Sequence, residues 1–202
     1  MELVEYGNKS EQLTFLQDVE LVNFILDGNE SAFEELVRRY HRPLTMYIHG
    51  MIGDYEISLD ITQEVFLKVY NCISQYSSVY RFSTWLYRIA HNAAVDYLRR
   101  HKRSEQSLDE DSEKFTIVEP ISRSLSPEME SESREWMKEI EKMIMCLPAI
   151  YRELIILRHT QDLSYEEIAE VTGLPLGTVK NRLFRAREMM KQMLIKRGFI
   201  RD

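Results

Sequence analysis

Apolar side chains recur at three- and four-residue steps along most of this chain, and the strict alternation typical of β-strands is absent. This periodicity predicts an all-α fold. In the first half of the chain we expect helices at 18–27, from 31 onwards, at 57–73 and at 84–101. The pattern resumes near Met129 and continues to the C-terminus, so a second helical unit is expected there.

Residues that start and interrupt helices refine these expectations. Ser31 and Ser164 each precede a glutamate by three residues, which is the spacing of a capping box, and Ser83 stands where a further helix would begin. Pro43 lacks the amide hydrogen that a helix interior needs. We therefore expect Pro43 to kink or restart the second helix.

The composition changes at Ser104. From 104 to 133 the chain holds eight serines and two prolines, and from 104 to 141 it holds twelve acidic residues against four basic ones. Such a stretch is too polar to form a packed core, so we interpret it as a flexible acidic linker between two small helical domains. The expected segments are a flexible N-terminal extension at 1–17, an N-terminal domain at 18–103, the linker at 104–132 and a C-terminal domain at 133–202.

The stretch LSYEEIAEVTGLPLGTVKNRLFRARE at 163–188 is the most specific local pattern. A short capped helix ends at Gly173, which can adopt the left-handed conformation that stops a helix. Pro175 stands where a second helix can begin, and that helix is basic. Two short helices joined by a glycine turn, the second one basic, are typical of a DNA-reading helix-turn-helix. The predicted partner is therefore duplex DNA.

The second helix of this motif has two faces. One face is apolar and is expected to pack on the domain core: Leu176, Val179, Leu183, Ala186 and Met190. On the other face, Lys180, Asn181 and Arg185 can reach base edges in a major groove. Phe184 can touch a thymine methyl group, and Gly177 leaves room for a phosphate. The alternative is a basic amphipathic helix on a solvated surface, which leaves the preceding helix and turn unexplained.

The charge of the chain is unevenly distributed. A formal net charge of −7 argues against a protein that binds DNA with its whole surface. From 171 to 202, however, there are eight lysines or arginines against two acidic residues. The C-terminal end is therefore the expected DNA-facing part.

Other site chemistries find no support in the sequence. Cys72 and Cys146 sit in apolar helical patterns and are interpreted as buried free thiols rather than a disulfide. The five histidines show no metal-ligand spacing with them. No apolar run is long enough to span a membrane, and the N-terminus lacks the features of a secretion signal. We expect a cytoplasmic protein without catalytic residues, metal, cofactor or small-molecule substrate.

Three segments together resemble a known family. Residues 147–188 resemble the C-terminal domain of extracytoplasmic-function (ECF) sigma factors, of the sigma-70 superfamily. The segments DITQEVFLKVY (60–70) and RFSTWLYRIAHNAAVDYLRR (81–100) resemble their N-terminal domain.

The resemblance implies a non-catalytic promoter-specificity subunit of bacterial RNA polymerase. Its N-terminal domain would bind the clamp of the largest polymerase subunit and open the minus-ten element. Its C-terminal domain would bind the flap and read the minus-thirty-five element as duplex. An anti-sigma factor is a further partner that the family suggests.

The resemblance and the residue types together assign three sets of site residues. Polymerase binding is expected from one stripe of the 57–73 helix, made of Asp60, Gln63, Glu64 and Lys68. Minus-ten binding is expected from an aromatic and basic segment, because single strands stack on aromatic rings in a positive groove. Its residues are Tyr76, Arg81, Phe82, Arg88, Asn92, Arg99 and Arg100. Minus-thirty-five binding is expected from Gly177, Thr178, Lys180, Asn181, Arg182, Phe184, Arg185 and Arg187.

Each assignment has an alternative. The polymerase-binding stripe can be an ordinary solvated helix face, Trp85 can belong to the core or touch DNA, and the linker carboxylates can be merely solvated or can mimic nucleic acid. For the whole chain, the rival is a helix-turn-helix regulator that acts without joining core polymerase, which leaves 60–70 and 81–100 unexplained. An enzyme with a helix-turn-helix appendage would need a glycine-rich phosphate loop, a metal cluster or a nucleophile–base pair, and the sequence offers none of these.

Overall fold

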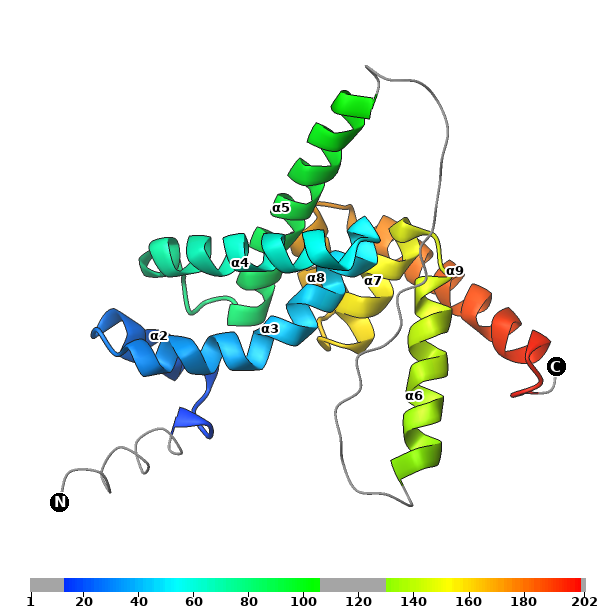
Figure 1. Ribbon diagram of the computed structural model, residues 1–202, viewed down its shortest axis with the longest axis horizontal. Coiled ribbons are helices and arrows are strands. Elements are labelled where there is room, and N and C mark those ends of the chain that lie inside the picture. Colours follow the sequence, from blue (N-terminus) through cyan, green and yellow to red (C-terminus); the bar gives the residue numbers. More distant parts are fainter. Residues whose placement is uncertain (1–12, 106–129, 201–202) are drawn as a thin grey trace.

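The computed structural model describes residues 13–105 and 130–200, and within these ranges the regular structure is helical (Figure 1). This confirms the all-α prediction. The helices are α2 (Asp18–Leu26), α3 (Glu30–Ile52), α4 (Tyr55–Cys72), the 3-10 turn η1 (Ile73–Gln75), α5 (Phe82–Glu105), α6 (Glu130–Met145), α7 (Ala149–His159), α8 (Tyr165–Thr172) and α9 (Leu176–Lys196). Most of the expected N-terminal extension and of the expected linker lies outside the described residues.

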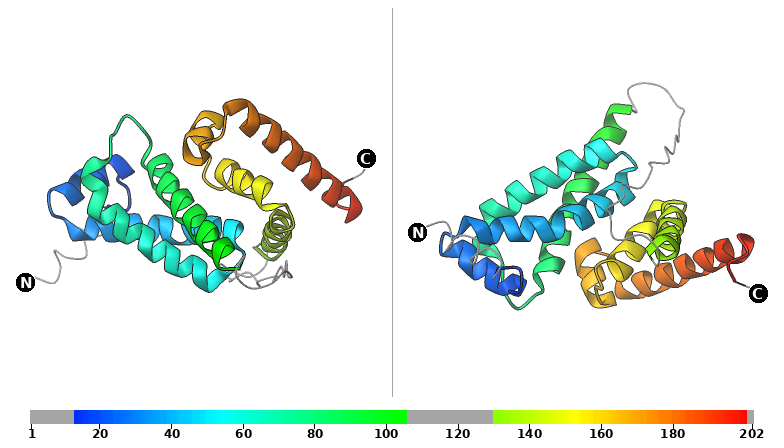
Figure 2. Two further views of the ribbon diagram at one scale, coloured as in Figure 1. Left: turned by 90° about the horizontal axis from the view of Figure 1, so that it is seen from above. Right: turned by 60° about the horizontal axis from the view of Figure 1, so that its bottom comes forward.

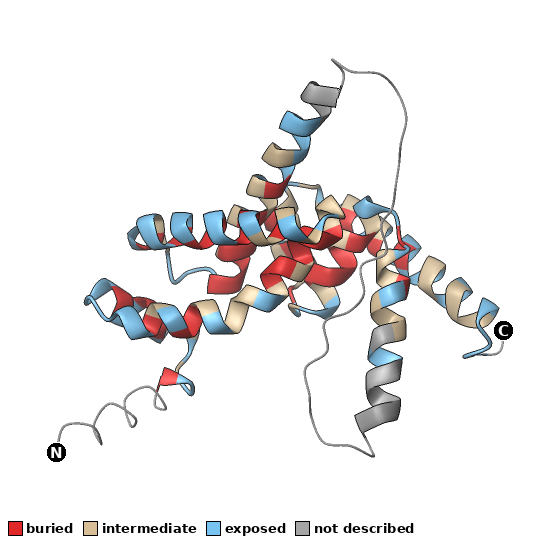
Figure 3. Ribbon diagram, in the orientation of Figure 1, coloured by how far each residue is buried: buried red, intermediate tan, exposed pale blue. Residues whose placement is uncertain are grey.

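The N-terminal domain is built around the long helix α3. Helices α2 and α4 pack along α3, and α5 crosses both α3 and α4 (Figure 1). Apolar residues from these helices meet in the interior, where Leu36, Leu44, Val65 and Leu86 are almost completely buried. The burial pattern of Figure 3 follows the predicted periodicity, because each helix turns one apolar face inward.

Helix α3 differs from its prediction in two ways. Its N-cap is Asn29 and not Ser31, since the Asn29 side chain accepts a hydrogen bond from the Ala32 amide at 3.3 Å. Pro43 lies inside the continuous helix, so of the two outcomes expected for it, a kink or a restart, the restart does not occur. The missing amide hydrogen costs one backbone hydrogen bond. Leu44 and Tyr47 on the following turn are fully buried, and this packing holds the chain helical beyond the proline.

Helices α4 and α5 also begin earlier than expected. The Asp54 side chain caps α4 by accepting a hydrogen bond from the Ile57 amide at 3.0 Å. Helix α5 begins at Phe82, and the Trp85 amide donates to the Arg81 carbonyl at 3.2 Å. The prediction that Ser83 caps this helix is therefore wrong. Ser83 lies within the first turn and is buried.

The helix-turn-helix prediction is confirmed in its local geometry. In the capping box of α8 the Glu167 amide donates to Ser164 Oγ at 3.1 Å, and the Ser164 amide donates to Glu167 Oε2 at 2.7 Å. Gly173 ends the helix with a φ of 68°, in the left-handed region that favours glycine. Helix α9 follows directly after Pro175.

The two domains pack against each other, which the sequence pattern did not predict. Helix α8 lies against α5, and α7 lies against α3 (Figure 2). Buried apolar residues from both domains form one continuous cluster. The expectation of two helical domains joined by a linker concerned only how the chain connects them, and their packing is a finding of the structure.

The two cysteines are free, as expected, but neither is buried. Cys72 at the end of α4 is partly exposed, and Cys146 after the end of α6 is exposed. The prediction of buried thiols was wrong. Both residues lie at helix ends, where the residues that follow them, Ile73 and Leu147, occupy the core positions. Among the described residues, no cluster of side chains has the make-up of a metal site.

Candidate nucleic-acid and polymerase interfaces

Helix α9 presents the expected reading face to solvent. The residues on that side are all exposed: Gly177, Lys180, Asn181, Phe184 and Arg185. Phe184 is the clearest case, because 64% of this large apolar residue is accessible to solvent. Val179, Leu183 and Ala186 on the opposite side are fully buried. The division of α9 into a core face and an exposed face is therefore confirmed.

Three further residues expected at the minus-thirty-five element lie beside this face. Thr178 and Arg182 are partly exposed, and Arg187 is exposed. The Arg187 guanidinium donates to the Tyr165 hydroxyl at 3.1 Å and lies 6.0 Å from the centre of that ring. Arg187 thus links α9 to α8, in addition to any contact it makes with DNA.

Gly177 is not required by the packing of the protein itself. A Cβ atom built at this position would meet no atom within 4 Å. The open space at the start of α9 leaves its backbone accessible to an external group, which is the property that phosphate contact at a helix N-terminus needs.

The aromatic segment before α5 is divided between core and surface. Phe82 is only 3% exposed and packs against Tyr40, Tyr76 and Trp85, with ring centroids 5.6, 5.6 and 5.8 Å away. Three other rings therefore enclose Phe82 in this structure, which places it in the core. A contact of Phe82 with DNA stays a prediction. An aromatic-rich sequence does not reveal which ring the others will bury.

The loop before α5 carries an exposed apolar residue that the sequence reasoning missed. Val79 is 84% exposed, and Tyr80 beside it is also exposed. The Tyr76 hydroxyl donates to the Tyr80 carbonyl at 2.7 Å and fixes the loop to the aromatic cluster. A valine between polar turn residues was the signal available in the sequence.

The polar residues expected to contact minus-ten DNA follow α5. Arg88, Asn92, Arg99 and Arg100 are exposed on this helix. Arg99 also pairs with Asp96 at 2.6 Å. Arg81, at the start of α5, differs from the others because its guanidinium lies against the helix-turn-helix of the C-terminal domain.

The expected polymerase-binding stripe on α4 is exposed as predicted. Asp60, Gln63, Glu64 and Lys68 all lie on the solvent side, whereas Ile61, Val65 and Val69 on the other side are buried. The packing of α4 therefore leaves the whole stripe free to contact another molecule.

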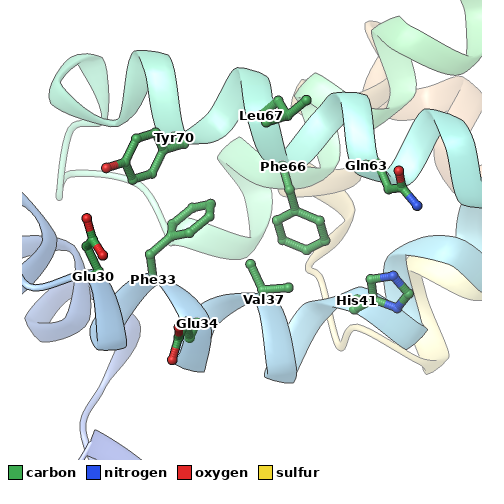
Figure 4. Close-up of a pocket in the computed structure, with 9 residues that line it drawn as sticks. All are labelled: Glu30, Phe33, Glu34, Val37, His41, Gln63, Phe66, Leu67 and Tyr70. Atoms are coloured by element: carbon green, nitrogen blue, oxygen red, sulfur yellow. The ribbon is translucent and has the colours of Figure 1, made fainter.

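A groove between α3 and α4 adjoins this stripe (Figure 4). Its lining residues are Glu30, Phe33, Glu34, Val37, His41, Gln63, Phe66, Leu67 and Tyr70. Leu67 is an apolar residue of α4 that does not share its buried face, since it is 66% exposed. The groove combines an apolar floor with carboxylates at its edge, which is a surface suited to a partner that carries apolar and basic side chains.

Comparison with known proteins places this geometry in a family. Residues 36–104 match the model for sigma-70 region 2, and residues 137–190 match the model for sigma-70 region 4. The ECF RNA polymerase sigma-E factor of Haemophilus influenzae is 37% identical over 188 residues, which cover 92% of this chain and 97% of that protein. The chain belongs to the ECF family of RNA polymerase sigma factors.

Other relatives of this sigma factor agree. The sigma-E factor of Escherichia coli is 37% identical over 194 residues, covering 93% of this chain and all of the relative. SigW of Bacillus subtilis is 34% identical over 171 residues, covering 83% of this chain and 91% of the relative. As an ECF sigma factor, the protein binds core RNA polymerase and promoter elements and has no catalytic activity of its own. The rival regulator that never joins polymerase is excluded.

Two solved structures share the fold of this sigma factor. The structure of CnrH in complex with the cytosolic domain of CnrY matches with a TM-score of 0.59 at 22% identity, over 88% of this chain and 96% of that one. RpoE of Bartonella quintana, in complex with the anti-sigma factor NepR, matches with a TM-score of 0.63 at 22% identity, over 80% and 96%. Within the described residues, no helix has the length and apolar character to cross a membrane.

Proposed function

We propose that the exposed face of α9 reads the minus-thirty-five element as duplex DNA. Lys180, Asn181 and Arg185 supply hydrogen-bonding groups for base edges in the major groove. Gly177, Thr178, Arg182, Phe184 and Arg187 surround these residues and supply contacts to phosphates and to a thymine methyl group. The observation that supports this assignment is that Lys180, Asn181 and Arg185 are exposed while Val179, Leu183 and Ala186 on the other side of α9 are buried.

The α4 stripe is the proposed docking surface for the polymerase clamp. Asp60, Gln63 and Glu64 form a carboxylate–amide surface that complements a basic partner, and Lys68 extends it along the helix. The neighbouring groove offers Leu67 and Tyr70 as apolar contacts beside this polar surface. The flap is the proposed polymerase contact of the C-terminal domain.

The surface of α5 and the loop before it are proposed to hold the opened minus-ten strand. Arg88, Arg99 and Arg100 would contact phosphates, and Asn92 would hold an unpaired base. Tyr76 and Arg81 lie at the N-terminal end of the same surface. Phe82 supports this site from the core, because its ring holds Tyr76 and Trp85 in place.

Further partners and the compartment follow from the family. Two structural relatives are complexes, one of CnrH with the cytosolic domain of CnrY and one with the anti-sigma factor NepR. We infer that an anti-sigma factor also binds this chain. The sigma factor itself is proposed to act in the cytoplasm, where core polymerase and promoter DNA are available.

The proposed domains of the sigma factor are 18–103 and 133–202, with the extension at 1–17 and the linker at 104–132.

Run-off transcription tests these assignments together. The purified protein is added to core polymerase on a library of genomic promoter fragments, and the transcripts are sequenced. We expect initiation from fragments that share a minus-thirty-five and a minus-ten element. Transcription that ignores changes in the minus-thirty-five element would contradict the role of α9.

A further inference from the structure

Two arginines from different helices meet at one aromatic ring where α7, α8 and α9 pack together (Figure 2). The ring belongs to Tyr165, the first residue of α8. The guanidinium carbon of Arg158, in α7, lies 5.4 Å from the centre of this ring, and that of Arg187, in α9, lies 6.0 Å from it. Arg187 also donates to the Tyr165 hydroxyl at 3.1 Å. The Tyr165 ring thus holds guanidiniums from both of the helices that flank α8.

Arg158 is fixed in place but remains accessible. Its guanidinium donates to the Leu163 carbonyl at 2.8 Å, a bond that orients the group without neutralising its charge. The Asp162 carboxylate lies 3.7 Å from the same nitrogen, and its side chain is 91% exposed, so this ion pair is weak. The Arg158 side chain itself is 33% exposed. An external anion can therefore reach Arg158.

The electrostatics at this junction show an excess of positive charge. Burial lowers the pKa of the neighbouring His159, and the charges of Arg187 and then Arg158 lower it further. Asp162 acts in the opposite direction but does not reverse the shift. Both guanidinium charges are therefore felt at the same place, and cations gathered in this way attract an anion.

This cluster lies at one end of the reading face of α9. Lys180, Phe184 and Arg187 follow one another at i, i+4 and i+7, so they share one stripe of the helix, and all three are exposed. Arg187 lies about 10 Å beyond Lys180 along the helix axis, at about 1.5 Å per residue. The major groove is about 12 Å wide and about 8.5 Å deep. When the first turns of α9 touch base edges, Arg187 consequently lies at the level of the phosphate backbone.

We propose that Arg158, Tyr165 and Arg187 form a phosphate clamp at the edge of the minus-thirty-five element. This inference rests on the proposed role of α9 and adds to it Tyr165 and a residue of α7, a helix outside the helix-turn-helix. Arginine has five N–H donors, so the bond from Arg158 to Leu163 and the bond from Arg187 to Tyr165 leave donors for phosphate oxygens. Tyr165 is a positioning residue, because its ring and hydroxyl hold the two guanidiniums side by side. A phosphate bound by both arginines joins α7 to α9 and fixes the angle at which α9 enters the groove.

Substitution of Arg158 tests the phosphate contact. The holoenzyme, reconstituted from the full chain and core polymerase, is titrated with a labelled duplex that carries only the minus-thirty-five element of a promoter found by run-off transcription. A scrambled duplex of the same composition is the second probe. Arg158→Ala should weaken binding to both duplexes by about tenfold at low salt. The slope of log affinity against log salt concentration should fall by about one, since one phosphate contact is lost.

Lys196→Ala is the matched control for charge. It removes one exposed cation from the same domain, near the far end of α9. This variant should keep the affinity and the salt slope of the wild type. Wild-type binding by Arg158→Ala, or an equal change in Arg158→Ala and Lys196→Ala, would overturn the clamp.

A mutant cycle tests the positioning role of Tyr165. Tyr165→Leu removes the ring and should weaken binding and lower the salt slope, whereas Tyr165→Phe keeps the ring and should have a smaller effect. In a protein that already carries Arg158→Ala and Arg187→Ala, Tyr165→Leu should cause no further loss, because the groups it positions are absent. Circular dichroism checks that each variant keeps its helices. An equal loss from Tyr165→Leu in both backgrounds would show that Tyr165 supports the fold and does not position the arginines.

Arg185→Ala separates failure of the clamp from failure of the proposed reading face. If Arg185→Ala loses the preference for the element over the scrambled duplex while Arg158→Ala binds like the wild type, the reading face stands and the clamp fails. If Arg185→Ala keeps that preference while Arg158→Ala lowers the salt slope, the reading residues are elsewhere and the phosphate contact is supported.

Discussion

Single side chains in this protein serve more than one purpose, and Glu167 is the clearest example. It completes the capping box of α8 and accepts a hydrogen bond from Thr84 across the domain interface. Burial alone would raise the pKa of Glu167, but hydrogen bonds from Ser164 and Thr84 and the charge of Arg81 outweigh it and lower the pKa. The ionised form is therefore the one that stabilises the folded protein.

This lowered pKa predicts a dependence of stability on acid. A carboxyl whose folded pKa lies below its unfolded value stabilises the protein above the unfolded value, and the contribution is lost as the pH falls through the folded value. For Glu167 the loss should begin near the usual value of 4.5 and continue below it. Thermal melts between pH 7 and 3 should show a shallower acid decline for Glu167→Gln than for the wild type. Equal slopes would contradict this role.

Arg185 is predicted to carry sequence specificity at the minus-thirty-five element. A good bidentate contact to a base is worth about 1–3 kcal/mol of discrimination. Arg185→Ala should therefore relax the preference at one or two positions, measured by competition between duplex variants. Arg187→Ala should instead weaken all sequences about equally and reduce the salt slope by about one. Uniform loss with unchanged specificity for Arg185→Ala would show that this side chain contacts only phosphates.

Substitutions of Phe82 and Asn92 are predicted to have different effects, because Phe82 belongs to the core and Asn92 is proposed to hold an unpaired base. Phe82→Ala removes a buried ring and should cost about 3–5 kcal/mol of unfolding free energy. Asn92→Ala should leave the thermal melt unchanged, because Asn92 is exposed, yet it should reduce permanganate reactivity of unpaired thymines at minus ten. A template with a pre-melted bubble should recover much of the lost transcription. If Asn92→Ala opens promoters like the wild type, the base is held elsewhere.

At the scale of helices, tertiary packing determined which of the helix start and stop patterns in the sequence produced the expected structure. The capping box of α8 formed as predicted because its residues contact one another within one turn. Pro43, in contrast, did not end α3, because buried neighbours on the next turn hold the helix. Helix α4 shows the same influence, since Leu67 is exposed beside the groove while the rest of its apolar face packs inward.

The α4 stripe gives a prediction at this scale. The double change Gln63→Ala with Glu64→Arg should abolish association with core polymerase, because it reverses the charge of the proposed docking surface. Helicity by circular dichroism and duplex binding by α9 should survive, since both side chains are exposed. Glu166→Arg, a charge reversal on α8, should leave polymerase association intact in the same pull-down measurement. Normal association of the double variant would refute the docking surface.

At the scale of the whole molecule, one apolar cluster joins two domains that the chain connects through a linker. Domains within a chain move relative to one another unless the interface between them is large and apolar. Because buried apolar residues of both domains form one cluster, we expect the two domains to unfold together. The charged side chains are distributed differently. Basic residues of α9 lie on its exposed face, whereas the carboxylates of Glu153 in α7 and Glu167 in α8 face α5.

This coupling predicts the shape of thermal unfolding. The wild type should unfold in one cooperative transition by calorimetry, with equal calorimetric and van't Hoff enthalpies. A Cβ atom at Gly50 in α3 would lie 2.6 Å from Ile156 Cδ1 in α7, so Gly50→Leu should push the two domains apart. We expect this variant to unfold in two transitions, because each domain then unfolds by itself. Two resolved transitions in the wild type would contradict a shared cluster.

The sequence by itself determined the features that depend on neighbouring residues. Helical periodicity, the capping box of α8, the glycine stop at Gly173 and the division of α9 and α4 into buried and exposed faces all follow from spacings within a few turns. The family resemblance rested on the same short segments. These features could be predicted because local geometry and a single apolar face decide them.

Only the tertiary structure decided which residues far apart in the chain meet. It buried Phe82 among three other rings, kept α3 helical through Pro43, and brought Glu153 and Glu167 onto α5. Each outcome depends on contacts between residues distant in sequence, and such contacts leave no periodic trace in a single chain. Local spacing therefore specified the helices and their exposed faces, whereas long-range packing specified which of those faces are available to DNA.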